Sequence, residues 1–195
     1  MPTMQDVKDA MQRVQDSLRA HLPKELLAYK ADQITILASE DQWKTAFRFI
    51  YDVVFKPANQ FKQEAGDFID GVLGFVTPTF DHQKRRIYIS PKAQGYSQDV
   101  QQMILSHEYI HWLSHQAFYP SMYMIGGDCP FRVEGVTQWL TVKRCGYQRE
   151  FNLLPAYRDE MLKTDSWLGG SPGNEQLMLD YIFKGKKTDL NGIRR

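Results

Sequence analysis

The sequence contains few cysteines: among its 195 residues, only Cys129 and Cys145 carry thiols. They do not form a close pair of metal ligands, and two thiols in a chain of this length do not suggest a disulfide scaffold. Free thiols are therefore expected, with a disulfide between the two as the alternative for a secreted protein.

The sequence also has no excess of charge of either sign. Its 24 basic and 23 acidic residues give a formal net charge of +1. A nucleic-acid footprint or a polybasic membrane arm requires a strong local excess of Lys and Arg. The balance of charge therefore predicts neither nucleic acid nor an anionic membrane surface as a partner.

Long apolar runs are absent as well. No stretch approaches the length that spans a bilayer, and residues 1–22 are charged and amphipathic without the apolar centre of a signal peptide. We therefore expect a soluble protein that does not insert into membranes. Its expected location is the cytoplasm, or outside the cell after export by a secretion system that needs no signal peptide.

The apolar content is sufficient for one sizeable core. With 43% hydrophobic and 13% aromatic residues, the chain suits a single globular domain over residues 1–195. Its pattern divides into an N-terminal helical segment (1–30), a sheet with a helix (34–117) and a mainly helical part (118–195). The expected fold class is α+β, with a small antiparallel or mixed sheet packed on the helix of the middle part.

Periodicity and capping residues predict the individual elements. A helix of about residues 3–20 is expected to pack on the body of the protein, with a partner-binding coiled coil as the alternative. Its apolar stripe consists of Val7, Met11, Val14 and Leu18. The other expected elements are a strand at 34–37, a helix beginning at Ser39, a hairpin of strands at 71–80 and 85–90, and helices at 97–116, 133–145, from 155 and near 174–183.

The helix expected at 97–116 contains the stretch ILSHEYIHWLSHQ, in which two histidines stand one turn apart. His107 and His111 share one face, so both imidazoles can bind one metal ion. Glu108 lies about 100° further round the helix, within reach of a water on that metal. The pattern H-E-x-x-H thus supplies two ligands and a general base. The alternative is a pair of core histidines hydrogen-bonded to backbone carbonyls.

A third ligand is offered by Glu134, at the start of the next expected helix and 23 positions after His111. A helix that folds back antiparallel after the intervening loop can present this carboxylate to the two imidazoles. Two imidazoles and one carboxylate leave a fourth position open for water. Among the common metals, this ligand set suits one zinc ion best.

These residues resemble the gluzincin group of zinc metallopeptidases, in which H-E-x-x-H on an active-site helix is completed by a glutamate on a following helix. The resemblance covers residues 34–146 and implies a zincin-like fold. It implies that one zinc ion is bound by His107, His111 and Glu134, and that Glu108 is the general base. It also implies a polypeptide substrate, bound in extended form beside an edge strand.

The chain departs from the best-known gluzincins at Gln138, where they carry an aspartate that orients a zinc-bound histidine. Glutamine can accept the same hydrogen bond but has no charge. His115 extends the histidine series, yet its Cα lies about 12 Å from that of His107 along a helix, so it is expected to be a packed, hydrogen-bonded neighbour. Ser114 and Ala117 stand where metzincins carry glycine and histidine, which excludes that class.

A peptidase also needs a hydrogen-bond donor for the oxyanion that forms during hydrolysis. The sequence does not rank the candidates, which are Tyr119, Tyr123, Arg132, Tyr147 and Tyr157. The loop expected at 118–131, with two glycines at its centre, is either a lid or a packed connection.

Three functions are compatible with these residues. The preferred hypothesis is a zinc-dependent endopeptidase, acting inside the cell or delivered as a secreted effector or toxin. The second is a catalytically inactive zincin-like module that binds a partner, and the third is a helical scaffold with incidental histidines. The metal content of the purified protein separates the scaffold from the other two.

Overall fold

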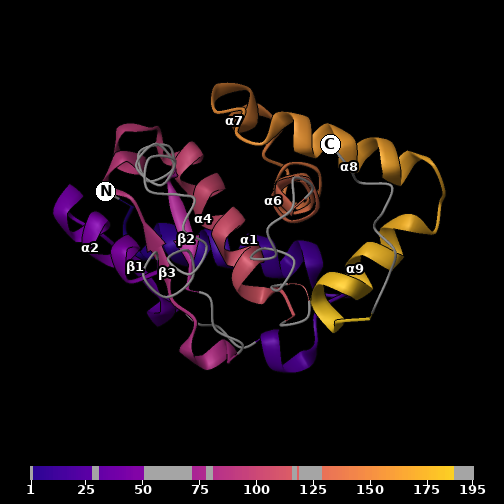
Figure 1. Ribbon diagram of the computed structural model, residues 1–195, viewed down its shortest axis with the longest axis horizontal. Coiled ribbons are helices and arrows are strands. Elements are labelled where there is room, and N and C mark those ends of the chain that lie inside the picture. The colour runs from indigo at the N-terminus through magenta and orange to yellow at the C-terminus, as the bar shows by residue number, and fades with distance from the viewer. Residues whose placement is uncertain are drawn as a thin grey trace, which may run out of the picture.

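The computed structural model describes residues 2–27, 31–50, 72–77, 81–115, 118 and 129–186. Within these ranges the protein is a mixed α+β structure with a small three-stranded sheet and mostly helical content, so the expected α+β class is confirmed. The helices are α1 (Met4–Leu18), α2 (Glu40–Ile50), α4 (Gln98–Leu113), α6 (Cys129–Trp139), α7 (Gln148–Leu153), α8 (Arg158–Gly169) and α9 (Asn174–Lys184), and the strands are β1 (Ile34–Ile36), β2 (Gly74–Val76) and β3 (Ile87–Ile89). Helix α4 lies between the sheet on one side and helices α6 to α9 on the other (Figure 1).

The sheet has the strand order β1-β3-β2, so β2 lies at one edge of the sheet in the described part of the chain. β1 pairs in parallel with β3, with Ile34 opposite Ile87. β2 pairs antiparallel with β3, with Gly74 opposite Ile89. The antiparallel pairing expected for the hairpin is therefore confirmed, over strands shorter than expected.

The sheet separates α2 from α4, because successive side chains of a strand point to opposite faces. On one face, the ring centroids of Phe75 and Tyr88 lie 5.2 Å apart, and that of Trp43 on α2 lies 5.0 Å from Phe75. On the other face, Ile87 and Ile89 are 0% and 1% exposed and belong to the core that contains α4. Helix α4 is therefore covered by an apolar layer on its sheet side.

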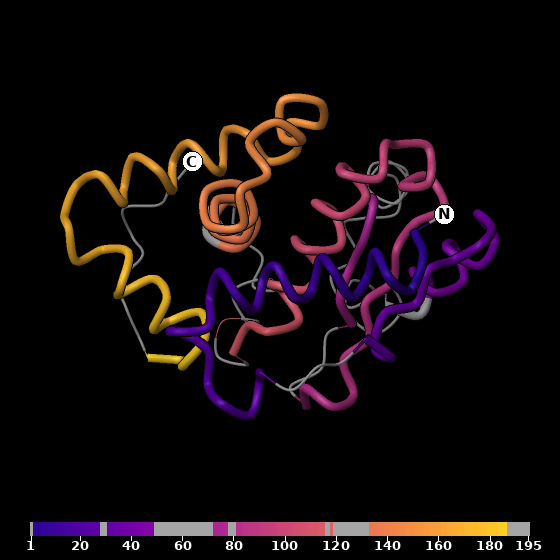
Figure 2. The backbone as a smooth tube through the Cα atoms, turned by 180° about the vertical axis from the view of Figure 1, so that it is seen from behind, coloured from indigo at the N-terminus to yellow at the C-terminus, as the bar shows by residue number. Residues whose placement is uncertain are grey.

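Helix α1 begins with a capping box and packs on α4. The Asp6 carboxylate accepts the backbone N–H of Thr3 at 2.6 Å, and the Thr3 hydroxyl accepts the backbone N–H of Asp6. The side-chain amide of Gln15 donates to the hydroxyl of Tyr109 on α4 at 2.8 Å. In Figure 2, which views the molecule from the opposite side to Figure 1, α1 runs across α4. The expected apolar stripe is fully buried and consists of Val7, Met11, Val14 and Leu18.

Helix α4 ends at Leu113, earlier than expected, because side chains from the β2–β3 connection bind its last carbonyls. Arg85, which is fully buried, donates from Nη1 to the carbonyls of Trp112 and Ser114, both at 2.6 Å. His82 shares the Ser114 carbonyl through Nε2 at 3.1 Å, and burial lowers its pKa to about 4, which keeps the ring neutral. A positive charge at a helix C-terminus is favourable, so Arg85 stabilises this end of α4.

Replacing Arg85 by Met should lower the free energy of unfolding by about 2 to 4 kcal/mol, because two charge-assisted hydrogen bonds are lost while the apolar stem is kept. Urea unfolding followed by circular dichroism measures the change. Arg86→Met is the matched control: the guanidinium of Arg86 donates hydrogen bonds to the backbone carbonyls of Gln83 and Arg85, in a more exposed position. Its cost should stay within about 1 kcal/mol, and an equal cost for both variants would contradict the role given to Arg85.

The boundaries of the later helices differ from the expected ones. Helix α6 begins at Cys129 rather than at 133, and a π-helical turn, Leu140–Arg144, continues it. Helix α7 has no counterpart among the expected elements, and α8 begins at Arg158 rather than at 155. Helix α9 agrees with the expectation. The starts of α7 and α8 follow Tyr147 and Tyr157, which are not among the residue types that cap helices, so these two boundaries have no capping signal.

Helices α6 and α8 pack closely against each other. A Cβ atom at Gly135 would lie 2.5 Å from the carbonyl oxygen of Glu160, so the small residue is required for this approach. Further along, the indole Nε1 of Trp139 donates to Asp165 of α8 at 2.8 Å. The position of α6 is therefore set mainly by α8.

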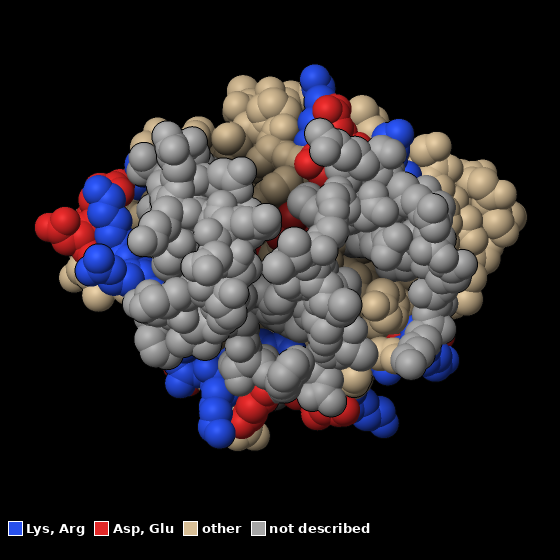
Figure 3. Space-filling view, in the orientation of Figure 1, with Lys and Arg blue, Asp and Glu red and all other residues tan. Residues whose placement is uncertain are grey.

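The described surface carries both signs of charge. On the face shown in Figure 3, basic and acidic side chains alternate around the visible rim, and neither sign gathers into one patch. Among the helices that the structure describes, none combines the length and the apolar character needed to cross a membrane.

Candidate metal centre

The side chains of His107, His111 and Glu134 meet at one point. The Nε2 atoms of the two histidines are 3.0 Å apart, and the Glu134 Oε2 atom lies 3.2 Å from the first and 3.1 Å from the second. Among the described residues this is the group that can hold a metal ion. The structure therefore brings together the three residues expected as ligands.

Two helices supply these ligands. His107 and His111 lie one turn apart on α4, whose burial on nearly all sides fixes their side chains. Glu134 lies in the second turn of α6, which Figure 1 shows end-on, crossing α4 steeply rather than folding back antiparallel as expected. This crossing brings the carboxylate of Glu134 to the Nε2 atoms of both histidines.

The spacing of the three atoms fits a single cation. A tetrahedral ion with ligand distances of about 2.0 to 2.1 Å holds its donor atoms about 3.3 Å apart, close to the observed 3.0 to 3.2 Å. Hydrogen bonds among the three side chains do not account for all three contacts. Each contact would need its own donor hydrogen, and the two Nε2 atoms carry at most one hydrogen each beside the carboxylate. One cation serves all three lone pairs, so the donor set fits a metal ion.

The surroundings of the histidines include one residue that the sequence did not indicate. Thr137 is buried, and its Oγ1 lies 3.4 Å from Nδ1 of His111. It stands three residues after Glu134 and hence on the same face of α6. This spacing in the sequence could have indicated Thr137 as a neighbour of the ligands. The hydroxyl is placed to orient the imidazole, as the partner of a ligand histidine does.

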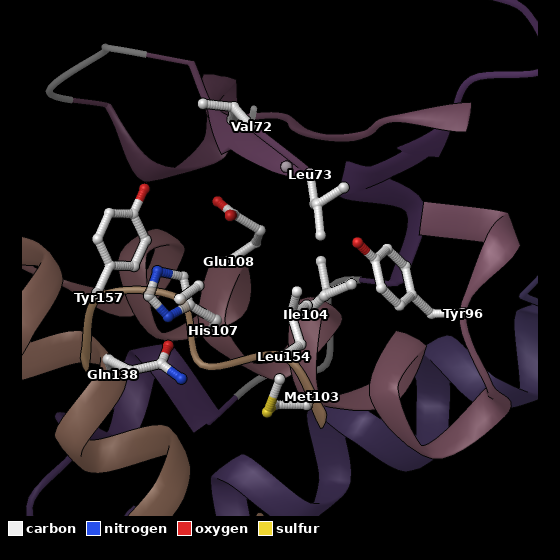
Figure 4. Close-up of a pocket in the computed structure, with 12 residues that line it drawn as sticks. Val72, Leu73, Tyr96, Met103, Ile104, His107, Glu108, Gln138, Leu154 and Tyr157 are labelled. Atoms are coloured by element: carbon white, nitrogen blue, oxygen red, sulfur yellow. The ribbon is translucent and has the colours of Figure 1, made fainter. Parts of the chain in front are cut away.

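Gln138, which stands where the best-known gluzincins carry an orienting aspartate, lies beside His107 at the cavity (Figure 4) but makes no hydrogen bond to it. Within the described part of the chain, Gln138 Nε2 and His107 Nδ1 are both buried without a hydrogen-bond partner. The contact to an imidazole comes instead from Thr137, one position earlier on α6.

The two glutamates of the site have different electrostatic environments. Burial raises the pKa of Glu108 to about 8, against the opposing effect of His107. Burial also acts to raise the pKa of Glu134, but the two imidazoles hold it well below its usual range. Carboxyl groups whose pKa values are pushed apart in this way take different roles. Glu134 is suited to stay anionic as a ligand, and Glu108 is suited to accept and release a proton.

Strand β2 lies directly over Glu108. A Cβ atom at Gly74 would sit 2.6 Å from Cγ and 2.9 Å from Oε1 of Glu108, so this strand position has room only for glycine. Glu108 itself is 7% exposed and opens onto a cavity that is also lined by His107 and by residues 72–74. Strand β2, at the edge of the described sheet, therefore forms one rim of the site.

Tyr157, one of the five candidate oxyanion donors, lies at this cavity. Its ring stacks on that of His107 with centroids 5.7 Å apart and planes 13° from parallel. The charge of Glu134 and burial raise its pKa, so the hydroxyl keeps its proton. Its backbone has a φ of 53°, a left-handed conformation that is unfavourable for a large side chain. Such strain is concentrated at functional sites.

Of the other candidate donors, Tyr147 is the one whose side chain the structure describes, and it does not line this cavity. Tyr147 lies on the far side of α4, where its hydroxyl is 2.9 Å from that of Ser106 and the guanidinium of Arg13 lies over its ring. Tyr119 and Tyr123 fall outside the described residues, and so does the side chain of Arg132. Most of the loop expected at 118–131 also falls outside the described residues, and its last residues, from Cys129 on, belong to α6.

His115 lies away from the three ligands, at the end of α9. Its backbone N–H donates to the carbonyl of Ile182 at 2.6 Å, and a side chain at Gly185 would collide with its ring. The expectation of a packed neighbour is confirmed. Cys145 is a buried free thiol, as expected, whereas the side chain of Cys129 falls outside the described residues.

Comparison of the chain with protein-family models, with curated proteins and with solved structures gives no match. Its function is therefore inferred from the side chains of the site.

Proposed function

We propose that the protein is a zinc-dependent endopeptidase with a zincin-like fold of the gluzincin type. The observation that supports this most is the triangle of His107, His111 and Glu134 beside the buried carboxyl of Glu108 in an open cavity. Two imidazoles and one carboxylate with a free coordination position form a ligand set typical of catalytic zinc. A purely structural zinc site would have four protein ligands, and the described residues supply three.

The residues of the site have separate roles in the proposed hydrolysis. Zinc bound by the three ligands would polarise the peptide carbonyl and lower the pKa of a water molecule. Glu108 takes a proton from the attacking water, whose oxygen bonds to the carbonyl carbon, and delivers it to the amine nitrogen as the C–N bond breaks. Tyr157 donates its hydroxyl proton in a hydrogen bond to the carbonyl oxygen as negative charge develops there.

Strand β2 is the proposed docking edge for the polypeptide. It pairs with β3 on one side only, within the described sheet, and Gly74 brings its backbone next to Glu108. An extended peptide that adds to this edge by backbone hydrogen bonds lies along the cavity. The scissile bond is then presented to Glu108 and the ligand cluster.

The test combines metal analysis with a search for cleavage. Purified protein is assayed for metal by mass spectrometry and is incubated with a diverse peptide library, whose products are identified. We expect one zinc per chain and cleavage that stops on chelation and returns with zinc. Zinc without cleavage would identify a binding module, and absence of zinc would leave the histidines as structural residues.

Gly74→Ala should lower turnover by about 10²-fold without loss of zinc. The added methyl group must displace either β2 or the buried side chain of Glu108, and a misplacement of about 1 Å can cost this much. Peptide hydrolysis and zinc content are measured together. Gly95→Ala is the matched control, because a Cβ atom there meets nothing within 4 Å. Equal rates for the two variants would show that β2 does not position the base.

A further inference from the structure

The cavity extends well beyond the ligand cluster, along α4 toward its N-terminus. Its volume is about 420 Å³, within the range of pockets that enclose a small ligand. His107 and Glu108 occupy one end, where the Glu108 carboxylate and the Tyr157 hydroxyl both point toward β2, and Tyr96 stands at the other end (Figure 4). The reaction proposed above uses only the first end.

The walls between these ends are apolar. Met103 and Ile104 lie one helical turn before His107 and Glu108 on α4, so they continue the same face of the helix as the floor of the cavity. Residues just before and at the start of β2, and residues from the segment before α8, close the sides. The apolar wall residues are Val72, Leu73, Met103, Ile104, Leu154 and Ala156.

Apart from the residues used in the proposed reaction, the described lining of the cavity offers no charged partner to a charged side chain. Its described lining contains no lysine, arginine or aspartate, and the proposed reaction already uses His107 and Glu108. Transfer of an unpaired charge into such a site is costly, whereas a large apolar side chain gains by leaving water.

We propose that this cavity is a specificity pocket for a large uncharged side chain, such as Leu, Met, Phe or Tyr, on a residue next to the scissile bond. The inference rests on the proposed peptidase function and names its substrate class. Because Glu108 forms one end of the pocket, a peptide with its carbonyl at the ligand cluster places a neighbouring side chain over Ile104 and Leu154. Glycine and alanine would leave this space unfilled, and a charged side chain would lie in it without a charged partner.

The first test is the cleavage profile over a peptide library with every residue type at each position. One position next to the cut should favour large uncharged residues over alanine by about 10-fold to 200-fold in kcat/KM. Binding is measured separately with the zinc-loaded Glu108→Gln protein and labelled peptides that carry Phe, Ala, Asp or Lys at that position. The Phe peptide should bind most tightly.

Two neighbouring leucines provide a matched pair of variants. Leu154 lines the cavity, whereas Leu153 is 66% exposed and absent from its lining. Leu154→Lys should shift the preference toward Asp and Glu at the selected position, a gain that loss of folding cannot produce. Leu153→Lys should leave the profile unchanged.

The outcomes separate this inference from the proposed function. Cleavage with no preference for side-chain size would contradict the specificity pocket but not the peptidase function. A Leu154→Lys cleavage profile identical to that of the unsubstituted protein would do the same. Selective binding of the Phe peptide without cleavage by the unsubstituted protein would support the pocket and overturn hydrolysis. Neither cleavage nor selective binding would overturn both.

Discussion

A Glu108→Gln protein is expected to keep one zinc ion per chain and to lose peptide hydrolysis by about 10² to 10⁴-fold. Glutamine has the shape of the carboxyl group but accepts no proton from the attacking water. The substituted side chain is not one of the three ligands, so metal content should be unchanged. The melting temperature should also change little, since a neutral amide replaces a carboxyl that burial already disfavours as an anion.

The control for this variant is Glu25→Gln, at an exposed position in the 3-10 turn Lys24–Leu27. Rates, zinc content and thermal unfolding of both proteins are compared with those of the unsubstituted chain. Full peptidase activity of the Glu108→Gln protein would show that another group is the base.

Glu134→Ala is expected to remove zinc on dialysis. Only two imidazoles then hold the metal, so affinity should fall far more than the 10 to 100-fold caused by loss of a residue that orients a ligand. Binding to the native state alone stabilises it in proportion to the logarithm of ligand concentration. Added zinc should therefore raise the melting temperature of the unsubstituted protein and leave that of the variant nearly unchanged.

Thr137→Val serves as a graded control for the third ligand. It removes the hydroxyl that lies 3.4 Å from Nδ1 of His111 and leaves all three ligands in place. Its zinc affinity should fall within the 10 to 100-fold range, measured by competition with a chelator of known affinity. Stoichiometric zinc in dialysed Glu134→Ala protein would mean that Glu134 is not a ligand.

The sequence predicts the parts of the site that depend on helical periodicity. His107, Glu108 and His111 lie on one continuous helix, whose 3.6-residue repeat fixes their relative directions regardless of the rest of the fold. The proximity of Glu134 was expected from the resemblance to gluzincins, and the structure brings it to the histidines by a steep crossing that local pattern does not encode.

Other features depend on tertiary packing, which a single sequence does not display. Arg85 was expected within an ordinary strand, yet it is buried and bonded to the end of α4. Tyr157 lies at the cavity because its backbone adopts a left-handed conformation, which nothing in the local sequence favours. Gly74 could have been noted, since a glycine inside a strand often marks a close approach of another group.

The bonds from Arg85 and His82 to the end of α4 have a consequence for the energetics of binding. They join the hairpin that carries the proposed docking edge to the helix that carries both histidines, and they involve no ligand. The conformational entropy of these two elements is therefore lost when the chain folds, and substrate binding does not have to order them relative to each other. A rigid arrangement set in advance leaves more of the interaction energy for affinity and rate.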